Sequence, residues 1–289
     1  MTFLITGADG QLGRALVDAF SAHGTVIACS RAELDITNTA QAAAVVSRAR
    51  PSVVVNCAAF NDVDGAEALQ ERAFDVNALG VLTLARAARD IGATLVHYST
   101  DFVFDGTAGR PYSEADPPSP RSVYAASKLV GEWMAADAGR WFVLRVASLF
   151  GVAHTPGTSR MGSIDRIIVA LEQGQPAKVF RDRVVSPSYV VDVAAATLSL
   201  LGGSAPSGTY HVVNTGHCTW YELAQEIANI IGGLEHLVPV DVASLALKAA
   251  RPQFGALDNS RLASVADPLP TWQDAIRRYL AFRQRPATI

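Results

Sequence analysis

The stretch Phe3-Leu-Ile-Thr-Gly-Ala-Asp-Gly-Gln-Leu-Gly13 decides the fold of this chain. Its first residues are apolar or β-branched, as in a buried strand, and a helical pattern runs from Gln11 to Ala22. Three glycines join the two segments. A strand that passes through a tight glycine turn into a helix leaves backbone N–H groups free to approach a pyrophosphate. The stretch therefore predicts a dinucleotide-binding turn beside a parallel sheet.

The same strand and helix patterns alternate through the first half of the chain. Further strands are expected at Thr25–Cys29, Ser52–Asn56, Thr94–Tyr98 and Trp141–Arg145, and helices at Thr39–Arg50, Glu67–Ile91 and Val123–Ala138. This alternation predicts an α/β fold of the Rossmann type, a doubly wound parallel sheet with helices on both faces.

The pattern loosens after Gly151. Helical segments are expected at Ser163–Glu172, Val191–Leu201, Trp220–Ile231 and Trp272–Phe282, and strands at Lys178–Phe180 and Thr209–Val213. We therefore expect an NAD(P)-binding domain over residues 1–150 and a smaller substrate-binding region over 151–289. In an alternative arrangement, the last strands of that region pair with the sheet of the first domain.

Composition narrows the class of protein. With 49% hydrophobic and 18% charged residues over 289 positions, the chain has the make-up of an ordinary folded protein. The net charge of −3 gives no reason to expect a nucleic-acid partner. We find neither a leader pattern nor an apolar run near the roughly 20 residues that cross a bilayer, so we expect a cytoplasmic protein with no membrane association. Cys29, Cys57 and Cys218 are expected to be buried thiols, because their spacing does not fit a metal site.

Residues near the glycine turn are candidates for holding a dinucleotide. The backbone at Gly7, Gly10, Gln11 and Leu12 is expected to meet the pyrophosphate. The small residues Cys57, Ala58 and Ala59 would let the nicotinamide half pass close to the backbone. Arg31 follows the second strand, where an acid commonly binds the ribose of NAD, and an arginine can instead pair with a 2′-phosphate. We therefore expect NADPH, with NADH possible if Arg31 is only a solvated loop residue, and we place Asp35 and Ile36 near the adenine.

Tyr124 and Lys128 stand four residues apart in a helical segment and therefore share one face. A free phenol, with a pKa of about 10, is a poor acid at neutral pH. A neighbouring ammonium lowers that pKa and makes the tyrosine a usable general acid or base. The fourth strand ends in Tyr98-Ser-Thr-Asp101, so hydroxyl groups are expected at the sheet edge where ligands bind. Together these residues predict a reductase that acts on a carbonyl.

Longer stretches connect the chain to a known family. A threonine at the strand edge followed by Tyr-x-x-x-Lys is the set used by short-chain dehydrogenase/reductases. Further matching segments span nearly the full length: Val55–Glu67, Val76–Gly80, His97–Gly106, Val123–Glu132, Arg251–Pro252, Leu257–Leu262 and Leu269–Trp272. On these residues the chain resembles the extended branch of that superfamily and, within it, the dTDP-4-dehydrorhamnose reductase family.

The resemblance implies NADPH-dependent reduction of the 4-keto group of an NDP-4-keto-6-deoxyhexose, a step of deoxysugar nucleotide biosynthesis. It implies that Thr100 orients the carbonyl, that Tyr124 protonates its oxygen and that Lys128 holds the nicotinamide ribose. Tyr98 would also contact the cofactor. The residues expected to meet the sugar nucleotide are Thr100, Asp101, Ser148, Arg183 and Arg251.

Departures from the family lie on the expected substrate side. Ser148 stands where the family usually carries a tryptophan, so we expect a pocket of different shape. Arg183 could clamp a diphosphate, stack on a nucleobase or be a solvated loop charge. Acidic residues that support a magnesium-dependent dimer in some members are replaced by Arg14, Ala15 and Tyr189–Val191. We therefore expect no metal, and a monomer or weak homodimer.

Other functions remain open. An epimerase or dehydratase of the same superfamily is the nearest enzyme alternative, although Asp101-Phe102 lacks the second acid that dehydratases carry. A non-catalytic NADP-binding regulatory subunit, like that of methionine adenosyltransferase, is the alternative outside catalysis.

Overall fold

The structure is a computed structural model and describes residues 1–151 and 161–284. Its centre is a six-stranded parallel sheet in the order β10-β5-β4-β3-β1-β2. The strands are β1 (Thr2–Thr6), β2 (Thr25–Cys29), β3 (Val53–Asn56), β4 (Thr94–Thr100), β5 (Arg140–Val146) and β10 (Gly208–His211). The strand order reverses between β1 and β3, which is where ligands bind in open sheets of this kind.

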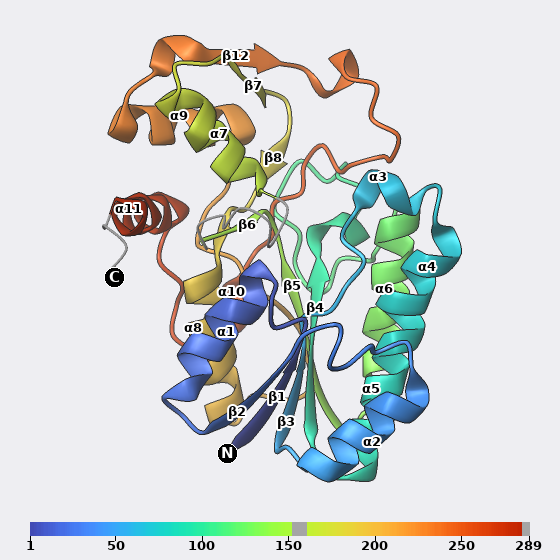
Figure 1. The fold of residues 1–289 in the computed structure, drawn as a ribbon. Coiled ribbons are helices and arrows are strands. Elements are labelled where there is room, and N and C mark those ends of the chain that lie inside the picture. Colours follow the sequence, from blue (N-terminus) through green and yellow to red (C-terminus); the bar gives the residue numbers. More distant parts are fainter. Residues whose placement is uncertain (152–160, 285–289) are drawn as a thin grey trace.

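Helices cover both faces of the sheet (Figure 1). One face carries α1 (Gln11–Ser21) and α8 (Val190–Gly202), and the other carries α2 (Thr39–Ala49), α5 (Gly80–Asp90) and α6 (Val123–Ala135). The side chains of β1 alternate between these layers, with Phe3 and Ile5 in one core cluster and Leu4 in the other. The predicted doubly wound α/β fold of the Rossmann type is confirmed.

A smaller unit with its own core lies over the carboxyl ends of the strands (Figure 1). Its elements are α7 (Ser163–Glu172), α9 (Trp220–Ile231), α11 (Trp272–Arg283), the parallel pair β7 (Ala177–Phe180) and β12 (Leu237–Val240), and the antiparallel pair β8 (Val184–Val185) and β11 (Cys218–Thr219). Both α8 and β10 also follow residue 151, yet α8 packs on α1 and β10 pairs with β5. The second half of the chain therefore contributes to both layers.

Short elements complete the two units. They are the parallel pair β6 (Leu149–Phe150) and β9 (Ser188–Tyr189), the helix α10 (Ser260–Ala263), and 3-10 turns at Asp101–Val103, Leu234–His236 and Val242–Ser244.

The segment expected to be one helix over Glu67–Ile91 is divided. It comprises α4 (Gln70–Phe74), a π-helical turn at Asp75–Leu79 and α5, and is preceded by the short α3 (Val63–Ala66). Asn77 lies in the π-helical turn, is fully buried, and donates hydrogen bonds to the Phe60 carbonyl and the Ser127 hydroxyl. A Cβ at Gly131 would lie 2.1 Å from the Asn77 carbonyl oxygen, so α6 packs directly on this turn. The wider turn therefore accompanies close packing against the helix that carries Tyr124.

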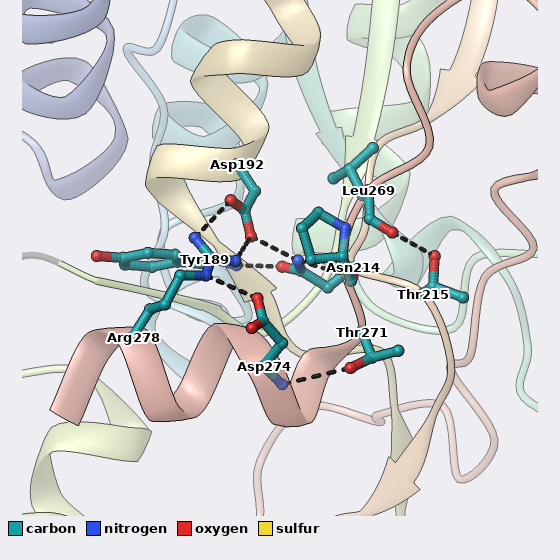
Figure 2. Close-up of polar contacts among 9 residues, drawn as sticks. Tyr189, Asp192, Asn214, Thr215, Leu269, Thr271, Asp274 and Arg278 are labelled. Atoms are coloured by element: carbon teal, nitrogen blue, oxygen red, sulfur yellow. Dashed lines mark hydrogen bonds and ion pairs between the residues drawn. The ribbon is translucent and has the colours of Figure 1, made fainter. Parts of the chain in front are cut away.

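The C-terminal helix α11 is held to the sheet layer by a polar cluster (Figure 2). Arg278 donates to both carboxylate oxygens of Asp192 on α8, at 2.9 and 2.7 Å, and its guanidinium lies over the Tyr189 ring. Asn214 donates to the same carboxylate at 2.6 Å and accepts from the Tyr189 backbone N–H. Asp274 accepts from Arg278 Nε at 2.7 Å. The cluster thus joins α8, α11 and the strand that leads into α8.

Further observations bear on membranes, metals and cysteines. No helix within the two described ranges is both long and apolar enough to cross a membrane. No group of three or more His, Cys, Asp or Glu side chains in those ranges could hold a metal ion. Cys29 and Cys218 are buried, whereas Cys57 is half-buried, because it follows β3 at the edge of a cleft.

Candidate active site

A cleft of about 520 Å³ lies at the carboxyl ends of β1, β3 and β4, between the sheet and the smaller unit. Fifteen of the predicted site residues line it: Gly7, Gly10, Gln11, Leu12, Cys57, Ala58, Ala59, Tyr98, Thr100, Asp101, Tyr124, Lys128, Ser148, Arg183 and Arg251. The fold therefore brings residues as far apart in sequence as Gly7 and Arg251 to one site.

The glycine turn leaves no room for side chains. Gly7 has φ +64°, and a Cβ there would lie 2.8 Å from the Ala58 backbone nitrogen. A Cβ at Gly13 would lie 2.3 Å from the Gly7 carbonyl oxygen. The first turn of α1 begins after Gly10 without a side-chain cap, and the buried Gln11 Nε2 has no partner among the described residues. These free donors and the missing Cβ atoms fit the pyrophosphate of a dinucleotide.

The three residues expected at the adenosine end lie outside the cleft lining. Arg31 is exposed, and its Nε lies 3.8 Å from the Asp35 carboxylate. Asp35 also accepts hydrogen bonds from Thr37, which hold the pKa of its carboxyl below the usual value. Ile36 is buried in the core with α2 and α5. The contact of these residues with a cofactor stays a prediction.

Tyr124 lies in the first turn of α6, which Ser122 caps by accepting from the Ala125 N–H. Burial raises the pKa of Tyr124, while a hydrogen bond with Thr100 acts in the opposite direction. We expected the Lys128 ammonium to lower the pKa of Tyr124. This prediction was wrong in direction, because burial of the phenol away from water raises its pKa. The Tyr124 phenol is therefore protonated at neutral pH and has a proton to donate, although its raised pKa makes it a weaker acid than a free phenol.

Asp101 lies beside the pair formed by Thr100 and Tyr124. The Thr100 hydroxyl donates to Asp101 Oδ1 at 3.1 Å, and the Phe102 N–H donates to the Thr100 hydroxyl at 3.2 Å. Burial raises the pKa of the Asp101 carboxyl to about 6, although the nearby Arg183 opposes this rise. The carboxylate therefore sits between the reacting hydroxyls and a buried cation.

Lys128 is 3% exposed and donates to the Tyr98 carbonyl oxygen at 2.6 Å. Burial lowers its pKa to about 8, although the negative charge of Glu132 one turn further along α6 opposes the shift. An amine with this pKa can gain and lose a proton near neutral pH.

Two arginines line the substrate side of the cleft. Arg183 is 8% exposed, and its Nε donates to the Pro252 carbonyl at 3.3 Å. Burial lowers the pKa of Arg183 to about 10. Arg251 donates to the Asp64 carboxylate at 2.7 Å, so it is already oriented. Ser148 has φ +44°, a strained conformation for a residue other than glycine, and lines the same wall.

A second cavity of about 420 Å³ adjoins the cleft. Both cavities are lined by Ser163, Arg166, Arg183, Trp220 and Arg251. Lys178 lines the second cavity but not the cleft. Two cavities that share several cationic lining residues are suited to an elongated anionic ligand.

Several residues of the site were not predicted from the sequence. Trp220 and Arg166 line both cavities, and the buried Trp220 Nε1 has no partner among the described residues. Asn56 and His97 lie on β3 and β4 behind Lys128. The only signal was position, since Trp220 opens a helix after the capping pattern Thr219-x-x-Glu222, and the polar Asn56 ends an apolar strand.

Comparison with known proteins gives consistent matches. The family model described as RmlD substrate binding domain matches residues 1–284. A dTDP-4-dehydrorhamnose reductase of Streptomyces griseus is 38% identical, covering 95% of this chain and 91% of that protein. A dTDP-4-keto-6-deoxy-D-glucose reductase of Streptomyces niveus is 36% identical, covering 95% and 94%.

A solved structure agrees with these matches. The dTDP-4-dehydrorhamnose reductase of Bacillus anthracis, in complex with NADP, superposes with a TM-score of 0.90 at 31% identity, covering 97% of this chain and 99% of that one. Because the family model matches residues 1–284 and the relatives match over nearly the full length, the chain belongs to the RmlD substrate-binding domain family, within the extended short-chain dehydrogenase/reductases.

Proposed function

We propose that the protein catalyses the NADPH-dependent reduction of the 4-keto group of an NDP-4-keto-6-deoxyhexose. The observation that carries this proposal is the convergence of Thr100, Tyr124 and Lys128 in one cleft with the glycine turn. The names of its relatives and the NADP bound to the Bacillus anthracis structure support it.

The cofactor would extend along the cleft from the glycine turn. Gly7, Gly10 and the start of α1 would hold the pyrophosphate, and Lys128 would hold the nicotinamide ribose. When bound, NADPH supplies the hydride. Arg31 is exposed and free of close packing, so it can move to meet a 2′-phosphate.

The protein supplies orientation and a proton. The Thr100 hydroxyl would donate its hydrogen bond to the substrate carbonyl oxygen and no longer to Asp101. This hydrogen bond would polarise the carbonyl. As hydride reaches the carbon, the Tyr124 O–H bond breaks and the proton passes to the carbonyl oxygen. The products are an alcohol, oxidised cofactor and a Tyr124 phenolate, to which the Lys128 ammonium returns a proton.

The nucleoside diphosphate of the substrate would occupy the second cavity and contact the cationic side chains that line it. Arg183 and Arg251 lie at the junction of the two cavities and can each form charge-assisted hydrogen bonds to phosphate oxygens. Trp220 Nε1 has its donor free for the same ligand. This arrangement favours a nucleotide sugar over a free sugar.

The test is NADPH oxidation with enzymatically prepared dTDP-4-keto-6-deoxyhexoses as substrates, comparing the wild type with Tyr124→Phe. Loss of the phenol should lower kcat by at least roughly 10²-fold while NADPH still binds. Tyr210→Phe is the matched control, because its buried hydroxyl donates to the Pro206 carbonyl away from the cleft. Full activity in Tyr124→Phe would contradict the assigned proton donor. Absence of turnover with NADPH bound would favour a regulatory role.

A further inference from the structure

Lys128 has a buried neighbour that the steps above do not use. His97 lies on β4, is 0% exposed, and its Nε2 is 3.5 Å from Lys128 Nζ. Burial lowers the pKa of His97 well below its usual value, and the positive charge of Lys128 lowers it further. The ring is therefore neutral and carries one N–H, on the nitrogen that its partners select.

Asn56 selects the tautomer of this ring. Its Oδ1 accepts from the Ala58 backbone N–H at 3.1 Å and from the Thr6 hydroxyl at 2.7 Å. Because a backbone N–H can only donate, the orientation of the amide group is fixed. The Asn56 amide nitrogen then faces His97 Nδ1 at 3.1 Å and donates to it. The ring proton therefore resides on Nε2, the atom that faces Lys128.

This proton affects the charge state of Lys128. An ammonium has no lone pair, so His97 Nε2–H and an ammonium would be two donors face to face, whereas a neutral amine can accept. Packing is close here, since a Cβ at Gly131 would lie 3.3 Å from His97 Nε2. Glu132 on α6 and Cys57 after β3 are the other titratable groups that act on Lys128, and both favour its charged form.

We propose that His97, oriented by Asn56, is a positioning residue for Lys128 that favours the neutral amine and so promotes return of the lysine proton to the Tyr124 phenolate. In that step an N–H bond of Lys128 breaks and the O–H bond of Tyr124 forms. The neutral amine of Lys128 then accepts a hydrogen bond from His97 Nε2–H until solvent supplies a new proton to the amine. The catalytic consequence rests on the proposed function, but the effect on Lys128 does not.

The chain is well suited to a direct test, because its lysines are Lys128, Lys178 and Lys248. In cofactor-free protein labelled with 13C at lysine Cε, NMR follows each lysine through a pH titration. Lys178 and Lys248 are exposed and serve as internal references, and Lys128→Met assigns the third resonance. The variant is His97→Gln, whose amide oxygen can turn toward the ammonium and accept from it.

We expect His97→Gln to raise the pKa of Lys128 by about one pH unit or more, since a facing donor is exchanged for an acceptor. His211→Gln is the matched control, because His211 is equally buried and neutral but faces Arg145. An unchanged Lys128 titration in His97→Gln would overturn the proposal. If His97→Gln does not fold, the same titration is run on His97→Asn, which keeps an acceptor for Asn56 but no longer reaches Lys128.

The pH dependence of activity distinguishes an effect of His97 on the charge of Lys128 from a purely structural role of the His97 ring. The charged lysine is present below its pKa, so wild-type activity should fall as pH rises through about 8. In His97→Gln this alkaline limb should move upward by the same amount as the NMR titration, with little change in KM for the keto sugar. A lower rate at every pH without movement of the limb would overturn the role in proton return. If no keto sugar is reduced, the proposed function fails, whereas the NMR titration still decides the effect on Lys128.

Discussion

The helix that carries Tyr124 and Lys128 is tied to the sheet by a buried ion pair. Glu132 on α6 accepts from Arg145 Nε at 2.9 Å and Nη2 at 2.7 Å, and both side chains are 5% exposed. The Ser99 hydroxyl donates to the same carboxylate at 2.5 Å. Arg145 also lies over the Phe104 ring and 3.4 Å from His211. Glu132 is therefore the counter-ion of the buried Arg145 guanidinium.

Glu132→Gln should destabilise the protein by about 3–5 kcal/mol, because it leaves the Arg145 charge buried without a counter-ion. For a chain of this size that corresponds to a fall in Tm of about 10 °C. Urea unfolding followed by circular dichroism measures the change. The control is Arg181→Gln, which breaks a pair of similar geometry between exposed Arg181 and Asp241 and should have a much smaller effect.

Two outcomes would show that the buried charge of Arg145 does not set this loss of stability. A loss below about 1 kcal/mol in Glu132→Gln would mean that water or rearrangement compensates Arg145. A double variant, Glu132→Leu with Arg145→Met, should recover part of the stability, because an apolar pair of similar volume leaves no buried charge. If the double variant is no more stable than the single one, packing and not charge dominates at this position.

Three further predictions concern the cofactor turn, a buried carboxyl and the last helix. Gly13→Ala should abolish NADPH binding in a fluorescence titration, since its Cβ would lie 2.3 Å from the Gly7 carbonyl, whereas Gly139→Ala, with open space around it, should bind normally. The folded-state pKa of Asp101, about 6, exceeds the ordinary value of 3.8, so ionisation of Asp101 weakens the fold as pH rises through this window. Asp101→Asn should therefore raise Tm at pH 8 relative to wild type but not at pH 4, and an equal change at both would contradict the charge argument. Arg278→Ala should cost about 2 kcal/mol in urea unfolding by leaving Asp192 without its bidentate partner, and an unchanged midpoint would mean that α11 is held by apolar packing alone.

The fold was predictable from the sequence because its signals are local. The apolar and β-branched runs expected to be strands at Ser52–Asn56 and Thr94–Tyr98 form β3 and β4, and α7 and α9 begin and end at the residues expected from their periodicity. The helix expected at Glu67–Ile91 was wrong in its continuity. Asn77 makes its hydrogen bonds to Phe60 and Ser127, which are distant in sequence, so periodicity could not reveal the π-helical turn.

The site was predictable only where chemistry follows a motif. Thr100, Tyr124 and Lys128 could be chosen by spacing, and the structure brings them to one cleft. The direction of the Tyr124 pKa shift could not be foreseen, because it depends on burial of the phenol against Ala66 and Ala73, which are distant in sequence. His97 and Asn56 carry no motif, and their relation to Lys128 depends on the alignment of β3 with β4, which pairs the two residues directly.

The fate of the hydrogen delivered to the sugar tests the proposed reduction. NADPH with deuterium at nicotinamide C4 is incubated with the protein and a dTDP-4-keto-6-deoxyhexose, and the product is examined by mass spectrometry and NMR. We expect one deuterium in the product, bound to C4 of the 6-deoxyhexose nucleotide, and no deuterated product from Tyr124→Phe. Product without deuterium at C4, or deuterium at another carbon, would contradict the proposed reduction.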